Sequence, residues 1–415
     1  MKHLFSNLAW YNRTEYFIFL LMTASVAIEW HLGIWALALL LLNTIAKGIA
    51  TGCWRNHRLR RVPRICLWLM VALYGVYALS SIYSSNPHEA WTTTLPTMLP
   101  LVMIPLAFLC SNHSYLRRRH FDGLVFLLAL CLTLRFAIML TKAAIGYCHG
   151  AQLNELIDFH FDPLHHNYLA MYLLAAVALL YAQLSSKWSR PRWRHLRWAV
   201  IADMMLLTLY MVIMGSRSGL VIFALLAAAW MAHLSFVRRQ WVATGLIAAA
   251  LAVMVAASYI AMPRLYWRII YSAQQMASGA KGDSRQTIWA CGLEVLKGHE
   301  ALGLGCDGYW DQLHQSYVDH NFAEGFLHEQ YNTHNQYLET TLCTGIFGLL
   351  ILLSIIAVPL VFAIRKTRNL PFVLFTIVYA GSLFFEVTLA RQMGLLFVLW
   401  WYCLLIDAPA KQGAE

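Results

Sequence analysis

Charged residues are scarce in this sequence. Asp, Glu, Lys and Arg make up 12% of its 415 residues, and its mean hydropathy is +0.56. Soluble domains carry about 25% charged residues, so a chain of two or three soluble domains is excluded. Apolar runs near the length that crosses a bilayer recur along the chain instead. We therefore expect an all-α polytopic membrane protein, surrounded by membrane lipids, whose helical bundle uses most of the chain.

The sequence also lacks the patterns of common metal and redox sites. Its nine cysteines include no CxxC pair, and no histidine pattern matches a zinc template such as HExxH. The polar run from Asp158 to His166 and the set His320, Glu324 and His328 are therefore interpreted as polar surface. No repeat of 20–50 residues and no low-complexity tract is apparent. We expect neither a metal ion nor a cofactor.

Twelve membrane spans are predicted from the apolar runs. The first two could form one long helix interrupted near Glu29, but two short helices fit the charge pattern better. The chain then divides into spans one to nine at 1–262, a large polar loop at 263–335, and spans ten to twelve with a tail at 336–415. The spans are expected near 16–29, 33–47, 64–82, 93–110, 122–146, 166–184, 197–214, 218–236, 241–262, 336–364, 371–389 and 393–407.

Basic residues alternate along these spans. Of the 31 lysines and arginines, 22 lie at the termini and in every second connection, for example at 47–64 and 187–197. Because cytoplasmic loops carry an excess of Lys and Arg, both termini are predicted to be cytoplasmic and the loop 263–335 to face outward. The same placement in short loops argues against nucleic acid as the partner of the net charge of +11.

Nine basic residues break this pattern. A charge within a span is costly unless it faces a partner or a wet cavity. For any single one, pairing or snorkelling is a sufficient explanation, as for Arg391 beside Glu386. Several cations at one membrane depth, on different helices, instead favour a shared anionic ligand. The nine are Arg135, Lys142, Arg217, Arg264, Arg268, Lys281, Arg285, Lys297 and Arg391.

The loop 263–335 is the only long stretch that is too polar to lie in a membrane, and apolar runs flank it on both sides. It is either a domain or a cover over an active site. Two of its cysteines, Cys291 and Cys306, could form a disulfide if the loop is extracytoplasmic. The loop ends at the polar stretch 332–335, directly before span ten.

Three short motifs and one arginine follow one another along the chain. Ser216–Leu220 carries Arg217 where a span opens, Asp283–Trp289 carries Arg285 at the start of an amphipathic helix, and His334–Glu339 closes the loop before Arg391. In order, sidedness and spacing these motifs resemble the O-antigen ligase family, which includes related bacterial polysaccharide polymerases. The resemblance covers the whole topology, with about twelve spans and one large periplasmic loop late in the chain.

The resemblance implies a glycosyltransferase of lipopolysaccharide biosynthesis, in the bacterial inner membrane with its active site facing the periplasm. The donor would be a glycan on undecaprenyl pyrophosphate, and the acceptor a sugar hydroxyl of lipid A–core. Arg217, Arg285, Arg391 and Arg135 would bind the pyrophosphate, since arginine stays charged and binds phosphate bidentately. His334 would be the general base, a role that suits imidazole near neutral pH. Its alternative role is only to start span ten.

Two further functions stay open. A polymerase uses the same lipid-linked donor, and the residues do not separate it from a ligase, although the chain length and single dominant loop favour a ligase. A transporter of lipid-linked glycans or anions belongs to a different class. Transporters often show internal duplication and spans broken at the midplane, and neither is clear here. A non-catalytic scaffold is disfavoured by the outer arginines.

Overall fold

The computed structural model describes residues 8–52, 54, 55, 59–113, 115–150, 165–187, 196–242, five positions between 244 and 252, 284–322 and 331–407. Every regular element in these ranges is a helix, and no strand occurs in them. The predicted all-α fold is therefore confirmed. Most of the ninth predicted span and all of the large loop before residue 284 lie outside the described residues.

The helices follow the predicted spans in chain order. Eight helical stretches are long and apolar enough to cross a membrane, while α19 and α20 are apolar but shorter, so the count of twelve stays a prediction. The elements are α2 (Leu8–Ile28), α3 (Trp30–Thr51), α4 (Arg61–Ser80), α5 (Pro87–Glu89), η1 (Ala90–Thr94), α6 (Leu95–Met98), α7 (Pro100–Cys110), α8 (Arg118–Cys148), α10 (His166–Lys187), α11 (Leu196–Ile213), α12 (Arg217–Ala232), η3 (His233–Val237), α18 (Gln336–Phe362), η4 (Ala363–Thr367), α19 (Leu370–Phe385) and α20 (Gln392–Ile406).

Two boundaries bear on the predictions. The first two spans are separate helices, because Glu29 between α2 and α3 has an extended backbone with φ −148° and ψ 101°. The two-helix interpretation is confirmed. Span eleven was predicted to reach residue 389, but α19 ends at Phe385, because Glu386 is extended with φ −155° and ψ 148°.

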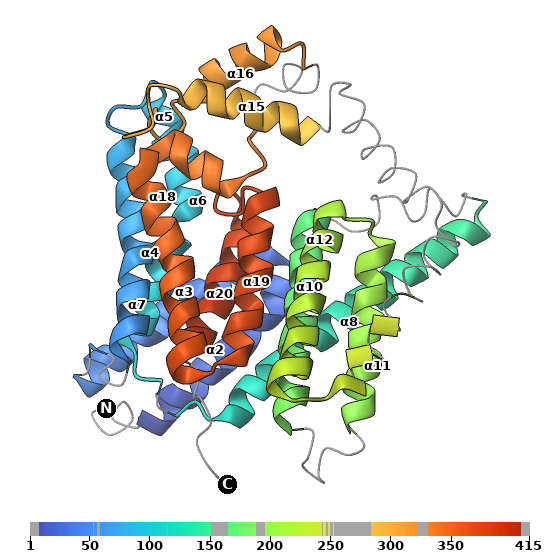
Figure 1. Cartoon of the computed structure of the whole chain (residues 1–415). Coiled ribbons are helices and arrows are strands. Elements are labelled where there is room, and N and C mark those ends of the chain that lie inside the picture. The colour runs from blue at the N-terminus through green and yellow to red at the C-terminus, as the bar shows by residue number, and fades with distance from the viewer. Residues whose placement is uncertain are drawn as a thin grey trace.

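Two shorter helices from the large loop, α15 (Ser284–Leu296) and α16 (Trp310–Asp319), lie across one end of the bundle. The first residues of α2 and the last residues of α20 lie at the opposite end (Figure 1). We call these the loop end and the terminal end. The two helices bury apolar faces, with Ile288 of α15 and Leu313 of α16 fully covered. The part of the loop at 284–322 is thus folded onto the helices rather than projecting from them.

A break in α18 fixes the loop to the bundle. Gly345 has φ +65° and a non-helical backbone inside this helix, and a side chain there would collide with the Ala301 carbonyl. The loop backbone forms hydrogen bonds to α18 at the break. Leu304 N donates to Leu342 O at 2.7 Å, and Ile346 N donates to Glu300 O at 2.9 Å. Backbone groups freed by the break are thereby satisfied, and the loop has a defined position over the bundle.

A buried ionic cluster joins α2 and α3 near the terminal end. Lys47 Nζ donates to Glu15 Oε2 at 2.8 Å and to Ser111 Oγ at 3.1 Å. Ser111 Oγ donates to Glu15 Oε1 at 2.7 Å, and His113 Nδ1 lies 3.6 Å from Glu15 Oε2. The side chains of Glu15 and Lys47 are 0% and 5% exposed. Each charge is therefore compensated by the other and not by water.

Removing one partner of this cluster should destabilise the protein more than removing both. We expect Lys47→Met to cost about 3–5 kcal/mol, because it leaves the Glu15 carboxylate buried without its hydrogen-bonded cation. The double variant Glu15→Gln/Lys47→Met should regain much of that loss. Thermal unfolding in detergent measures both, with the exposed Lys366→Met as control. A double variant no more stable than Lys47→Met would contradict this account.

Candidate functional site

The segment Asn332–Asn335 leads from the large loop into α18 and carries His334. His334 has φ +46°, in the left-handed region that few non-glycine residues adopt. Its backbone N–H donates to Asn332 Oδ1 at 3.0 Å. The next residue caps the helix, since Asn335 Oδ1 accepts from the N–H groups of Tyr337 and Leu338. The contacts on both sides hold the His334 backbone in one conformation.

A buried carboxylate ties this segment to the loop. Thr333 Oγ1 donates to Glu339 Oε2 at 2.7 Å, and the Tyr309 hydroxyl donates to Glu339 Oε1. Trp289 Nε1, from α15, donates to the Thr333 carbonyl at 3.1 Å. Glu339 is only 6% exposed. The position of His334 is therefore set jointly by α15, α18 and the turn before α16.

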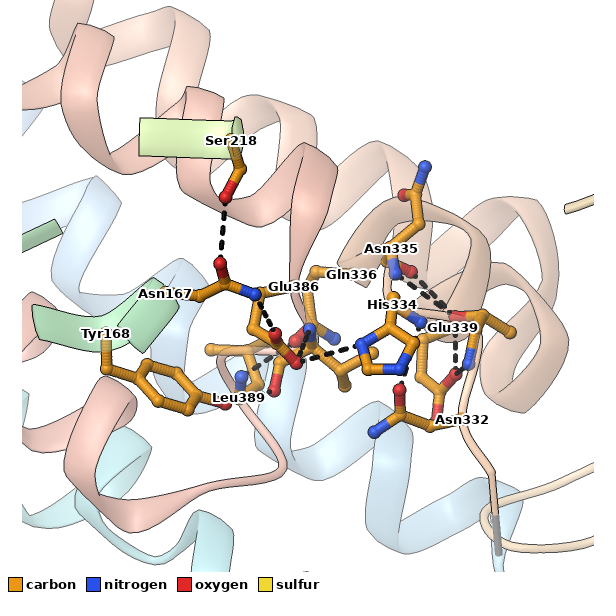
Figure 2. A network of polar contacts seen from close by, with 12 residues as sticks. Asn167, Tyr168, Ser218, Asn332, His334, Asn335, Gln336, Glu339, Glu386 and Leu389 are labelled. Carbon is orange, nitrogen blue, oxygen red and sulfur yellow. Dashed lines mark hydrogen bonds and ion pairs between the residues drawn. The ribbon is translucent and has the colours of Figure 1, made fainter. Parts of the chain in front are cut away.

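The imidazole of His334 faces a carboxylate from the connection between α19 and α20. Its Nδ1 lies 3.4 Å from Glu386 Oε1 (Figure 2). This is an ion-pair distance, long for a hydrogen bond. The His334 side chain is 24% exposed and that of Glu386 only 8%. The pair thus combines an accessible imidazole with a shielded carboxylate, and Nε2 is the ring nitrogen that does not face Glu386.

The other oxygen of this carboxylate is held from α10. Asn167 Nδ2 donates to Glu386 Oε2 at 2.8 Å, and Asn167 Oδ1 accepts from Ser218 Oγ at 2.9 Å (Figure 2). Asn167 Oδ1 also accepts from Ser216 Oγ at 3.2 Å. Asn167, Ser218 and Glu386 line a small pocket together with Thr388. A series of hydrogen bonds and one ion pair therefore connects the start of α12, through Asn167 of α10 and Glu386, to His334.

The surroundings of Glu386 keep it ionised. Burial alone would raise its pKa, but the adjacent His334 imidazole, the hydrogen bond from the Asn167 amide and the charge of His165 outweigh burial and lower the pKa from 4.5 to about 2. The carboxylate is thus negative at any physiological pH. A fixed negative charge beside Nδ1 favours a proton on that nitrogen.

The low pKa of Glu386 makes stability depend on pH. A carboxyl whose folded pKa lies below its unfolded value contributes stability above the unfolded pKa and loses it as pH falls through the folded pKa. We expect the thermal midpoint of Glu386→Gln to lie below that of the wild type above pH 4.5, and the gap to close as pH falls towards 2. The exposed Asp311→Asn should show no such gap. A constant gap across this range would contradict the ionised Glu386.

The predicted arginines come to this place from three elements. Arg217 is the first residue of α12, directly between Ser216 and Ser218, and Arg391 is the N-cap of α20. Arg285, in the first turn of α15, lies with its guanidinium 5.5 Å from the centre of the Phe385 ring. Loop and bundle therefore both contribute cations to the region around the Glu386 segment.

Two histidines before and at the start of α10 lie among these charges. Burial lowers the pKa of His165, Glu386 opposes this, and the charges of His334, Arg391 and Arg285 lower it further. Arg217 and Arg285 also lie close enough to the neighbouring His166 to interact with it electrostatically. The structure thus brings three of the four predicted pyrophosphate-binding arginines together with His334.

Helix direction adds to the positive potential. The helices α10, α12, α18 and α20 all begin in this region, which is near the loop end (Figure 1). The N-terminus of a helix carries the positive end of its dipole. With the arginines, this arrangement favours an anionic group beside an imidazole that can accept a proton.

The fourth predicted arginine has a different setting. Arg135, in α8, donates to the carbonyls of Ala27 at 3.2 Å and Ile28 at 2.8 Å, at the end of α2. Its role in pyrophosphate binding stays a prediction.

Cys291 and Cys306 are free thiols, so the disulfide that the sequence allowed is absent. The predicted outer cations Arg264, Arg268 and Lys281, and the polar residues Asp158, Glu324 and His328, lie outside the described residues.

Sequence reasoning missed the partners of His334. The sequence suggests Glu386 only as a partner for Arg391, but within the described residues its ion pair is with His334. Asn167 has no sequence signal beyond its place after a polar run, and the pattern around His165 indicates only polar surface. The one available signal for Glu386 is a carboxylate inside the outer end of the predicted span 371–389.

Comparison with known protein families gives a match over part of the chain. Residues 202–353 match the O-antigen ligase family. This region contains Arg217, Arg285 and His334, whereas Asn167, Glu386 and Arg391 lie outside it. A search of curated proteins found none that matches the chain. The family resemblance is confirmed over residues 202–353, where this multi-pass helical protein matches the O-antigen ligase family.

Proposed function

We propose that the protein is an O-antigen ligase that transfers a glycan from undecaprenyl pyrophosphate to a sugar hydroxyl of lipid A–core. The reaction takes place at the periplasmic face of the bacterial inner membrane. The observation that carries this proposal is the His334–Glu386 pair, with Nδ1 and Oε1 3.4 Å apart, placed among Arg217, Arg285 and Arg391. A base next to a cationic site is what attack on a pyrophosphate-activated sugar requires.

In this mechanism Glu386 keeps the proton of His334 on Nδ1, so that Nε2 is free to accept one. Nε2 takes the proton of the acceptor hydroxyl. The acceptor oxygen forms a bond to the anomeric carbon of the donor sugar as the bond from that carbon to the pyrophosphate oxygen breaks. Undecaprenyl pyrophosphate leaves with the bonding electrons. The imidazolium formed at His334 is stabilised by Glu386 and later releases its proton to water.

The arginines stabilise the leaving group. Negative charge grows on the pyrophosphate as the glycosidic bond breaks, and cations fixed in advance at that place lower the barrier. Arg217 and Arg391 come from the bundle and Arg285 from the loop, so the loop completes the site from above the membrane helices. Arginine supplies permanent charge and paired N–H donors, and we therefore propose that transfer needs neither a divalent cation nor a nucleotide.

A polymerase is the second candidate. It would use the same donor and the same base, and would differ only in taking a second lipid-linked glycan as its acceptor. The family match at residues 202–353 is compatible with both enzymes. The acceptor that is consumed therefore decides between them.

The test uses purified full-length protein in detergent with a lipid-linked glycan, lipid A–core and excess EDTA. A ligase forms glycan-capped lipid A–core and releases undecaprenyl pyrophosphate. Longer lipid-linked chains without lipid A–core product would indicate a polymerase. No transfer, together with movement of the donor across reconstituted vesicles, would indicate a transporter. Activity lost in EDTA and restored by one added metal would overturn metal independence.

A further inference from the structure

Asn167 lies in the first turn of α10 and joins two parts of the site that come from different helices. Its amide nitrogen donates to Glu386 Oε2 at 2.8 Å, and its amide oxygen accepts from Ser218 Oγ at 2.9 Å. Ser216 Oγ also donates to Asn167 Oδ1, at 3.2 Å. One planar amide is therefore bonded on both sides, to the partner of His334 and to the residues that flank Arg217.

The surroundings hold this amide in place. At Gly219 a side chain would lie 2.9 Å from the Ala170 Cβ, so α12 and α10 approach closely just below Asn167. Ser216 is the N-cap of α12 and accepts from Gly219 N at 3.1 Å. The residue after Asn167 adds a second bond to the Glu386 segment, since the Tyr168 hydroxyl donates to the Val387 carbonyl at 3.2 Å.

We propose that Asn167 is a positioning residue, whose amide holds Glu386 against His334 and sets the start of α12, with Arg217, at a fixed place relative to that carboxylate. This inference rests on the proposed function and goes beyond it, because it couples the proton-accepting half of the site to the phosphate-binding half. Only a side chain with a donor and an acceptor at one end fulfils both tasks. Asparagine does so, whereas aspartate accepts on both sides.

Aspartate at this position separates the two tasks. It can still accept from Ser216 and Ser218, but it places a second carboxylate beside Glu386 Oε2. Two buried carboxylates at hydrogen-bond distance cannot both stay ionised as easily as one, so the pKa of the pair rises. Glu386 would then lose charge at a higher pH, and with it the orientation of His334. The acidic limb of the pH–rate profile should move upward.

A matched control exists at the other end of α19. Asn369 is buried and also bonded on both sides, accepting from Phe372 N at 3.2 Å and donating to the Leu405 carbonyl at 2.8 Å. It caps α19 at the terminal end of the bundle. Asn369→Asp therefore tests the loss of a comparable buried amide without touching the site.

The experiment compares Asn167→Asp, Asn167→Ala and Asn369→Asp in purified full-length protein. We expect both Asn167 variants to lower kcat by about a hundredfold, since misplacing a reacting group costs that much, with little change in the KM for the donor. The acidic limb should shift upward by about one pH unit or more in Asn167→Asp. Asn369→Asp should lower only the thermal midpoint. Rates and profiles at the wild-type level in Asn167→Asp, or equal losses in Asn369→Asp, would overturn the proposal.

A substrate-free readout separates this inference from the proposed function. The pH at which the wild type loses the stability supplied by Glu386 can be followed by thermal unfolding alone. If Asn167→Asp moves this loss to higher pH, the coupling of Asn167 to Glu386 stands even where the wild type transfers no glycan. If the loss does not move, the positioning role fails, whatever the activity of the wild type.

Discussion

Replacing His334 by alanine should lower the rate of glycan transfer by about 10²–10⁴-fold, the usual cost of losing a general base. Donor binding should stay near the wild-type level, because the arginines come from other elements and are untouched. Folding should also hold, since Asn335 still caps α18 and Thr333 still bonds Glu339. In cells, the glycan-capped lipopolysaccharide should disappear while the membrane level of the protein stays normal.

Two further variants make this result specific. His334→Asn tolerates the positive φ of +46°, so its activity should be as low as that of alanine with the backbone undisturbed. His320→Ala removes another loop histidine, whose Nε2 lies 3.6 Å from Glu294, and should leave transfer unchanged. Normal product from His334→Asn at a normal membrane level would reduce His334 to a residue that starts α18.

Lysine at Arg217 or Arg285 should remove most of the activity, and alanine should be about as poor. Lysine keeps the charge but loses the forked pair of donors that matches a phosphate. These bonds strengthen as the leaving group gains charge, so their loss falls on the transition state. Steady-state kcat and KM for the donor measure the effect, with the exposed Arg365→Lys at the terminal end as control.

The double variant tests whether both arginines act on one group. If Arg217 and Arg285 bind the same pyrophosphate, the combined loss in kcat/KM should be smaller than the product of the two single losses, because groups that act together are not additive. A lysine variant with nearly full activity would show that only a diffuse positive potential is needed. Variants that fail to accumulate would favour a structural role as partners of nearby carboxylates.

Much of the fold could be predicted because the bilayer restricts a spanning segment to a narrow range of length and hydropathy. The separate helices α2 and α3 were predictable from the charge pattern. The ends of helices near the site were not. The helix α19 ends before Glu386 because the Glu386 carboxylate accepts a hydrogen bond from Asn167 of α10. The helix α18 is broken at Gly345 because backbone groups of the loop form hydrogen bonds to it there.

The candidate site was predictable only in part for the same reason. His334, Arg217 and Arg285 lie in short motifs whose order along the chain can be recognised. Asn167 and Glu386 are 219 residues apart, and nothing in either local sequence points to the other. Their relation depends on the packing of α10 against α19, which a single sequence does not reveal.

The central claim is that one pyrophosphate lies among the arginines with its sugar facing His334. A structure of the protein with a non-cleavable phosphonate analogue of the lipid-linked donor tests it most directly. We expect the two phosphate or phosphonate groups of the analogue to lie between Arg217, Arg285 and Arg391. The anomeric carbon of its sugar should lie on the side of His334 Nε2. An analogue bound with its phosphorus groups away from these arginines, or with the sugar out of reach of His334, would contradict the account.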